Sequence, residues 1–220
     1  MALSKAEEDY IKSIFRLQQE TGQANTSAVA QDLRTKPASV TDMLKKLKAK
    51  KLLHYEPYQD FKLSAEGRKT ALSIVRRHRL WEFFLVEKLG LGWDEVHDIA
   101  EQLEHVSDQR LIEKLDAYLG FPETDPHGDP IPDAQGRMKV QPRISLALLP
   151  LNVPADVCSV GNQSSEMLEM LEHLHIRIGT RLEIKRRFDF DGSAEVKIRS
   201  KPPFVISLTT AQNLFVVYDQ

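Results

Sequence analysis

Residues 27–51 decide the fold of the N-terminal part of the chain, and they read SAVAQDLRTKPASVTDMLKKLKAKK. Apolar residues recur here at helical spacing in two short runs, and a hydroxyl residue, Thr26 or Ser27, is placed to cap the first run. Pro37 suits the first turn of the second helix. Only three or four residues, around Thr35, separate the runs. This spacing is typical of a helix-turn-helix unit, whose second helix enters the major groove of DNA.

The flanking sequence extends this unit into a winged helix. A helical apolar pattern over residues 5–20 predicts a preceding helix that ends at Thr21-Gly22. After the second helix, the apolar segments 52–55 and 61–63 flank a short polar stretch that contains Pro57. Such a pattern predicts a β-hairpin.

The rest of the chain divides into a helical part and a β part. Helices are expected over residues 64–89, capped by Ser64, and over residues 93–105 and 107–119. Their apolar faces suit a homodimer interface, although a monomer core would leave the same pattern. Prolines rule out a long helix between residues 120 and 143. Five strands are then expected at 153–160, 181–188, 194–198, 204–208 and 214–218, with one helix at 164–174 and a hairpin turn at 189–192.

These elements predict a mostly α N-terminal two-thirds followed by a small all-β barrel. We expect a winged helix-turn-helix DNA-binding domain over residues 1–70, a helical metal-binding and dimerisation domain over 71–143, and the barrel over 144–220.

Composition bounds the function. No stretch approaches the roughly 20 apolar residues that span a bilayer, and the first residues lack the core of a signal peptide, so we expect a cytoplasmic protein without a membrane partner. The single cysteine, Cys158, excludes an intramolecular disulfide and a multi-thiolate zinc site, and its default interpretation is a small buried apolar residue. The net charge of −2 hides a segment of net charge +6 at 34–51 and one of −11 at 82–133.

Histidines and carboxylates gather at helical spacing in the acidic segment. His97, Glu101, Glu104 and His105 fall on one stripe of a helix. At about 1.5 Å per residue, the two histidines of this stripe lie about 12 Å apart and cannot share one ion, which indicates two metal sites. Further oxygen and nitrogen ligands of the same kinds are Asp9, His78, Glu82, Asp125 and His127. Any metal must therefore be held by oxygen and imidazole.

Together these segments resemble the family of metal-dependent repressors that comprises the diphtheria toxin repressor and the manganese transport regulators, in its three-domain form. The order and spacing of six motifs carry the resemblance: EDYI at 8–11, KPASVT at 36–41, RHRLWE at 77–82, EVH at 95–97, EHVSD at 104–108 and FPETDPHG at 121–128. The C-terminal part is similar to the family's SH3-like (FeoA-like) domain in its pattern of short strands and in its position along the chain.

The resemblance implies a primary metal site made of Asp9, Glu101, Glu104 and His105. It implies an ancillary site made of His78, Glu82 and His97, to which Asp125 and His127 contribute. Iron-sensing members carry methionine and cysteine at the positions of Asp9 and Glu101, so the oxygen ligands here favour Mn²⁺, with Fe²⁺ as the other candidate. Lys12 stands where some manganese sensors carry a glutamate ligand, and Asp125 where close relatives carry cysteine.

The basic segment supplies the expected DNA contacts. The first turn of the recognition helix faces base edges, while hydroxyls and lysines contact phosphates. The candidate residues are Ser27, Pro37, Ala38, Ser39, Thr41, Asp42, Lys45 and Lys46. Because few of them read hydrogen-bond patterns, we expect DNA shape to contribute to recognition.

The function expected from this combination is repression, and not catalysis. Metal binding fixes the first helix and sets the spacing of two reading helices in a homodimer, which binds a pseudo-palindromic operator and represses metal-uptake genes. Two alternatives remain open: a metal-independent winged-helix regulator that responds to a small organic ligand, and a binuclear metallohydrolase. The sequence contains no catalytic Ser-His-Asp set and no glycine-rich phosphate loop.

Overall fold

A computed structural model describes residues 3–55, 60–106, 108–199 and 201–218. The chain divides into two compact units. The first comprises Met1–His78, Glu101–Leu115 and Pro132–Met138, and the second comprises Arg79–Ala100, Asp116–Ile131 and Lys139–Gln220.

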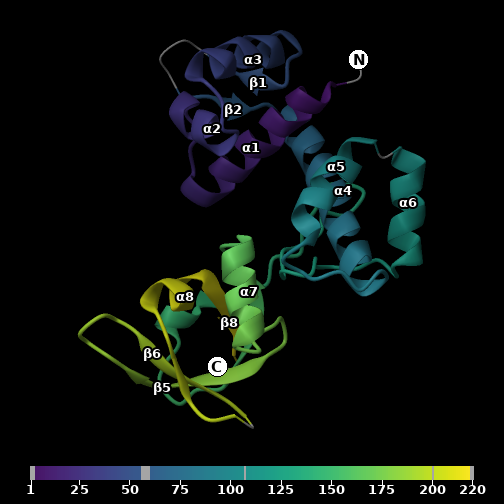
Figure 1. The fold of residues 1–220 in the computed structure, drawn as a ribbon. Helices are drawn as coiled ribbons and strands as arrows, with labels where there is room; N and C mark the ends of the chain where they lie inside the picture. Colours follow the sequence, from purple (N-terminus) through teal and green to yellow (C-terminus); the bar gives the residue numbers. More distant parts are fainter. Residues whose placement is uncertain (1–2, 56–59, 107, 200, 219–220) are drawn as a thin grey trace. The chain divides into compact units, whose positions relative to one another are not determined.

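The first unit contains the expected winged helix-turn-helix, in which α1 packs against α2, α3 and β2 (Figure 1). Its elements are α1 (Lys5–Thr21), α2 (Thr26–Asp32), α3 (Pro37–Ala49), β1 (Leu53–His54) and β2 (Lys62–Leu63). A capping box between Ser4 and Glu7 begins α1. The hydroxyl cap expected for α2 is wrong. Asn25 caps this helix instead, because its side-chain oxygen accepts a hydrogen bond from Ala28 N at 2.9 Å.

The hairpin of β1 and β2 is antiparallel, and it leads into α4 (Ala65–Glu87). Ser64 caps α4 as expected, since its hydroxyl accepts a hydrogen bond from Gly67 N at 3.0 Å. Gly67 is required there, because a Cβ would lie 2.0 Å from the carbonyl oxygen of Leu52. Next come α5 (Val96–Val106) and α6 (Gln109–Tyr118). The expected cap residue Ser107 lies outside the described residues, while Asp108 Oδ1 accepts a hydrogen bond from Arg110 N.

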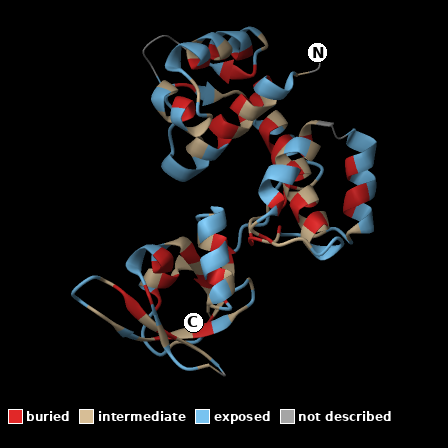
Figure 2. Ribbon diagram, in the orientation of Figure 1, coloured by how far each residue is buried: buried red, intermediate tan, exposed pale blue. Residues whose placement is uncertain are grey.

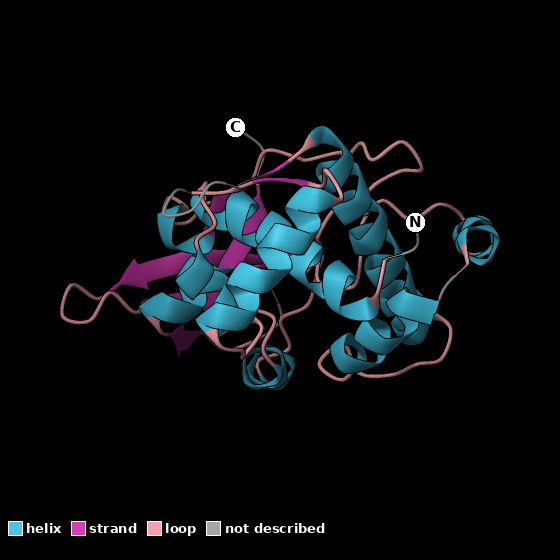
Figure 3. Cartoon of the chain, turned by 90° about the horizontal axis from the view of Figure 1, so that it is seen from above, coloured by secondary structure: helices cyan, strands magenta, loops and turns pink. Residues whose placement is uncertain are grey.

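The C-terminal part forms one antiparallel sheet with strand order β3-β8-β4-β5-β6-β7. Strands are drawn in magenta in Figure 3. The strands are β3 (Ile144–Ser145), β4 (Ala155–Val160), β5 (Arg181–Arg187), β6 (Ala194–Ile198), β7 (Phe204–Ile206) and β8 (Leu214–Val217). A 3₁₀ turn, η1 (Leu146–Leu148), follows β3, and α7 (Ser165–His173) follows β4.

Two details of this sheet differ from expectation. The sheet has six strands among the described residues, whereas five were expected. The sequence did not indicate β3, because a strand of two residues shows no alternating pattern. The strand expected to reach Leu208 ends at Ile206. Ser207 caps a short helix there, α8 (Leu208–Asn213), by accepting a hydrogen bond from Thr210 N at 3.1 Å.

Each unit has its own apolar core, and Figure 2 shows buried positions recurring along α1 and α3 and along the strands of the sheet. Trp93 packs into the core of the sheet. The expectation that Cys158 is buried is wrong, because its thiol is only half-buried at an alternate position of β4. Within the described ranges, no helix is both long and apolar enough to cross a membrane.

Candidate metal centre

Glu104 is the centre of a polar cluster in the first unit, where α1, α4 and α5 meet. Its carboxylate is completely buried. Oε2 lies 2.6 Å from His78 Nδ1 on α4, and Oε1 lies 3.5 Å from His105 Nε2 on α5. A buried carboxylate is stable only with hydrogen-bond or cation partners, and here it has several.

His105 is oriented by a carboxylate outside the expected ligand set. Its Nδ1 lies 2.8 Å from Glu8 Oε2, so Nδ1 carries the proton and donates it to Glu8. Glu8 is itself held by Arg77 Nη2 at 2.8 Å. Nε2 is thereby left as the nitrogen with a free lone pair, which is the arrangement of a metal-binding histidine with a supporting carboxylate.

The other side of this imidazole faces Asp9. His105 Nε2 and Asp9 Oδ1 are 2.8 Å apart, yet among the described residues neither atom has a partner in hydrogen-bond geometry, although both are buried. Burial is the main cause that raises the pKa of Asp9 above its usual value. Two buried atoms with lone pairs that face each other fit a divalent cation, and Asp9, Glu104 and His105 can each offer a ligand atom within 4.8 Å of one another.

Lys12 on α1 is a feature of this cluster whose partners the sequence did not predict. Its ammonium group forms ion pairs with Glu101 and, at 2.7 Å, with Glu104 Oε1. Burial lowers the pKa of Lys12, but the charges of Glu104 and Glu101 outweigh this effect and raise it overall. Lys12 is therefore charged at neutral pH and partly neutralises the cluster.

The four residues expected in the primary site are thus gathered here, but Glu101 is arranged differently from the other three. Glu101 forms a candidate group with Glu104 and His78, and not with Asp9. His78, which the resemblance assigned to the ancillary site, has a partner in Glu104. Spacing along the chain carries no information about this contact, because 26 residues separate the two.

A second cluster lies wholly in the second unit and contains Glu82, Asp125 and His127, all buried. His127 Nε2 donates a hydrogen bond to Trp93 O at 2.8 Å, so Nδ1 carries the lone pair. Nδ1 is buried, lacks a hydrogen-bond partner within the described part of the chain, and lies 3.9 Å from Glu82 Oε2. His97 is half-exposed, with Nδ1 3.3 Å from Glu82 Oε1. This second set also has the oxygen and imidazole composition that suits a hard divalent cation.

The loop that carries this cluster is fixed against strand β4. Val160 N donates to His127 O at 3.0 Å. Gly128 has φ 85°, and a Cβ there would lie 1.9 Å from the carbonyl oxygen of Cys158, so only glycine fits. Backbone N–H groups of His127 and Asp129 donate to Asp125 Oδ1 at 2.9 and 3.0 Å. The ligand atoms are therefore held by the backbone as well as by their own contacts.

Asp125 has a strongly increased proton affinity. Burial, followed by the charges of Glu82 and Asp129, raises its pKa to about 7. Arg79 opposes this effect with Nε 3.4 Å from Asp125 Oδ2, and Arg79 also pairs with Asp129 at 3.2 Å. In the absence of a metal ion, the Asp125 carboxyl therefore keeps its proton up to about neutral pH.

The residues expected to contact DNA lie on α2 and α3. Pro37, Ala38, Ser39, Asp42, Lys45, Lys46 and Ser27 are exposed, and Thr41 is partly buried. Thr41 Oγ1 donates to Pro37 O at 3.1 Å, and Lys45 lies 3.4 Å from Asp42. This surface is available to a nucleic acid.

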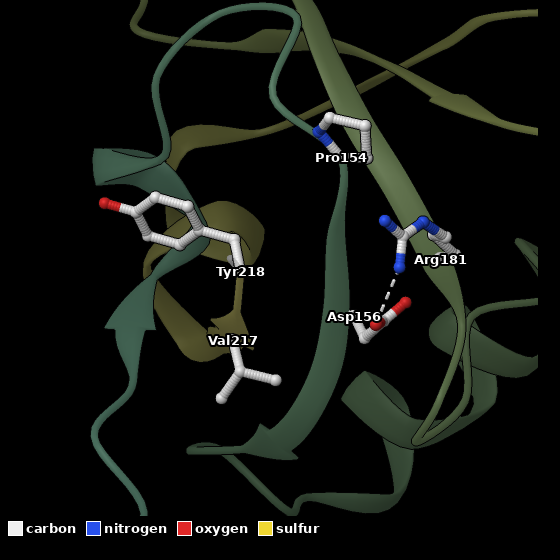
Figure 4. Close-up of a pocket in the computed structure, with 5 residues that line it drawn as sticks. All are labelled: Pro154, Asp156, Arg181, Val217 and Tyr218. Atoms are coloured by element: carbon white, nitrogen blue, oxygen red, sulfur yellow. Dashed lines mark hydrogen bonds and ion pairs between the residues drawn. The ribbon is translucent and has the colours of Figure 1, made fainter. Parts of the chain in front are cut away.

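A small cavity of about 90 Å³ on the C-terminal sheet is of a different kind (Figure 4). It is lined by Pro154, Asp156, Arg181, Val217 and Tyr218. The one carboxylate there is paired with Arg181 Nη1 at 3.0 Å. The cavity thus lacks the set of convergent ligands seen in the two clusters.

Comparison with known proteins connects these observations. Three family models match: the iron-dependent repressor N-terminal DNA-binding domain at residues 2–60, the iron-dependent repressor metal-binding and dimerisation domain at 64–133, and the FeoA domain at 144–218. The first two describe a DNA-binding and dimerising protein that responds to metal. They support neither the metallohydrolase nor the metal-independent regulator.

Individual relatives agree. The diphtheria toxin repressor of Corynebacterium jeikeium is 30% identical over 171 residues, which cover 78% of this chain and 71% of the relative. The transcriptional regulator MntR of Oceanobacillus iheyensis is 36% identical over 114 residues, 52% of this chain and 77% of the relative. A solved manganese-dependent transcriptional repressor in complex with manganese superimposes with a TM-score of 0.88 at 34% identity, covering 96% of this chain and 99% of that chain. The chain belongs to the family of metal-dependent transcriptional repressors that includes the diphtheria toxin repressor.

Proposed function

We propose that this chain is a homodimeric repressor whose affinity for operator DNA is controlled by Mn²⁺, or by Fe²⁺, bound at the cluster of Asp9, Glu104 and His105. The observation that carries the proposal is the pair of buried, facing atoms Asp9 Oδ1 and His105 Nε2, 2.8 Å apart without a hydrogen bond. These two residues come from α1 and α5, so a cation shared by them joins the two helices. Glu101 completes the primary site in this proposal.

One feature favours manganese over the other candidates. The ligands are carboxylates and imidazole, without a thiolate or thioether in the primary set, and this composition suits a hard ion. The similar proteins include both kinds, since one solved structure is named as a manganese-dependent transcriptional repressor and one relative as the iron-dependent repressor IdeR. Iron therefore remains the second candidate.

The second cluster is proposed as the ancillary site. Glu82, Asp125 and His127 form its buried part, and His97 completes it from the more exposed side. His78 belongs to this set by family resemblance, while its Nδ1 lies 2.6 Å from Glu104 Oε2 in the structure. Two independent ions per chain follow from this assignment.

The proposed repressor works through three segments. Residues 1–70 bind a pseudo-palindromic operator through α2 and α3, residues 71–143 bind metal and form the dimer, and residues 144–220 form the SH3-like domain. The action takes place on DNA in the cytoplasm and lowers transcription of metal-uptake genes. A bound ion favours the DNA-competent arrangement by a coupling energy of about 1–3 kcal/mol, which is typical of such regulation.

Calorimetric titration of metal-free protein with Mn²⁺ tests the two sites separately. The wild type is expected to bind two ions per chain. Glu104→Gln is expected to lose one of them and His127→Gln the other, because each substitution removes a buried ligand from one cluster only. Unchanged binding in both variants would refute the assignment of the sites.

A further inference from the structure

The ammonium group of Lys12 occupies part of the primary cluster. Its side chain is 18% exposed, and it reaches from α1 to two carboxylates of α5, those of Glu101 and Glu104. The contact to Glu104 is 2.7 Å, and this carboxylate is completely buried. The chain thus carries its own cation at the point where α1 meets α5.

The same oxygen atom serves both this lysine and the candidate ion site. Glu104 Oε1 accepts from Lys12 Nζ, and it is also the oxygen nearest to His105 Nε2, at 3.5 Å. A divalent cation held by Glu104 and His105 would therefore stand close to a positive ammonium group. Like charges that lie close together in a buried site, away from the screening of water, repel each other strongly, so the two cations oppose each other.

We propose that Lys12 is an internal competitor for the metal ion: its ammonium group holds Glu101 and Glu104 in the metal-free protein, and a divalent cation binds in exchange for these contacts. This inference rests on the proposed metal site at Asp9, Glu104 and His105. In this proposal, Lys12 lowers the affinity of the primary site and thereby sets the concentration of free metal that the protein needs. The same ion pairs link α1 to α5 before metal binds. Metal binding would replace them by a link through the ion.

Removal of the ammonium group should then have opposite effects on the two forms of the protein. The metal-free form loses an ion pair between α1 and α5 and becomes less stable. The metal-bound form loses a positive charge that repels the ion, so its free energy falls relative to that of the metal-free form. A residue that merely supports the fold would weaken both forms together.

The test is Mn²⁺ binding by isothermal titration calorimetry, with thermal unfolding of the metal-free protein, in Lys12→Gln. We expect binding at the primary site to tighten by at least about tenfold, which is about 1.4 kcal/mol, and the metal-free midpoint of unfolding to fall. Lys12→Arg, which keeps the charge, should keep the affinity close to that of the wild type. It also serves as the second variant if Lys12→Gln does not fold. Weaker binding or unchanged affinity in Lys12→Gln, or clearly tighter binding in Lys12→Arg, would overturn the proposal.

Lys50→Gln is the matched control. Lys50 also pairs with a carboxylate of α1, Glu7, at 2.6 Å, but neither residue belongs to the metal cluster. Its loss should lower stability and leave Mn²⁺ affinity unchanged. The titration also separates this inference from the proposed site: if Glu104→Gln binds Mn²⁺ as well as the wild type does, the site itself is wrong, whereas an affinity lost in Glu104→Gln but untouched in Lys12→Gln contradicts only the competition.

Discussion

His105 Nε2 on α5 lies 2.8 Å from Asp9 Oδ1 on α1, and both atoms are buried without a hydrogen bond. The contact joins the first helix of the DNA-binding part to the helix that carries three of the four ligands proposed for the primary site. Without a cation it leaves two lone-pair atoms facing each other, which is unfavourable. A bound cation would turn this unfavourable contact into a link between the two helices.

Glu8 supports this centre without being one of its ligands. Its carboxylate accepts the Nδ1 proton of His105 and thereby fixes which nitrogen faces the metal. We predict that Glu8→Gln weakens Mn²⁺ binding at the primary site by about 10–100-fold, as removal of such supporting partners typically does. Calorimetry measures this directly. The adjacent Glu7→Gln, which changes the contacts to Lys50 and to the Ser4 capping box but none to the metal cluster, should bind Mn²⁺ as the wild type does, and equal affinities in all three proteins would contradict the role of Glu8.

Asp125 gives the metal-free protein a specific pH dependence. Its pKa is about 7 in the folded protein, against an ordinary value of 3.8, because of its burial and the charges of Glu82 and Asp129. Between these two values the folded protein holds a proton that the unfolded chain has released. The free energy of unfolding therefore falls as the pH rises through this window, by at most about 1.4 kcal/mol per pH unit, and the lost stability is greatest above pH 7.

Urea unfolding at pH 5 and pH 8 in the presence of a chelator checks this expectation. Asp125→Asn cannot titrate at this position, so its stability relative to the wild type should improve by about 2 kcal/mol from pH 5 to pH 8. The comparison cancels the other titrating groups. A difference between the two proteins that is the same at both pH values would show that Asp125 is ionised in the fold throughout.

Lys46 on α3 tests the DNA-binding surface. It is exposed on the helix expected to enter the major groove, where a lysine contacts phosphate and not base edges. We predict that Lys46→Ala weakens binding of every DNA sequence to a similar degree and reduces the slope of log affinity against log salt by about 1. Fluorescence anisotropy at several salt concentrations measures both. Lys201→Ala, in the C-terminal part, should leave the slope unchanged, and an unaltered slope in Lys46→Ala would exclude that contact.

Gly67 couples the wing to the helical part of the chain. A Cβ at this position would lie 2.0 Å from the carbonyl oxygen of Leu52, which also accepts a hydrogen bond from Ser64 N. We predict that Gly67→Ala lowers the free energy of unfolding by about 1–3 kcal/mol, as overpacking usually does, despite the better helix propensity of alanine. Lys69→Ala, an exposed position on the same helix, should be nearly neutral in the same chemical unfolding experiment. Equal stabilities would show that the wing moves freely away from α4.

The sequence was informative where neighbouring residues make the structure. The helix-turn-helix, the hairpin and the spacing of Glu101, Glu104 and His105 follow from local periodicity, and the structure confirms these elements. The sequence also indicated which residue types could hold a metal, since carboxylates and imidazoles are groups that bind hard divalent cations.

The sequence was uninformative where the contact is distant. Lys12 and Glu101 are 89 residues apart, and no pattern in either segment indicates that they pair. The roles of Glu8 and His78 depend on where α1 and α4 pack against α5, and the tautomer of His127 depends on the carbonyl of Trp93. The sequence did not indicate short elements such as α8, because six residues are too few to show a helical period.

The central claim, that a cation at Asp9, Glu104 and His105 controls DNA binding, is tested most directly by operator affinity as a function of free Mn²⁺. Anisotropy titrations with a labelled operator should show that the wild type gains at least about fivefold in affinity between chelator and saturating Mn²⁺, which corresponds to the low end of typical coupling. Glu104→Gln should bind equally with and without the metal. The account would be contradicted if the operator affinity of the wild type did not change with Mn²⁺, or if Glu104→Gln responded to Mn²⁺ as the wild type does.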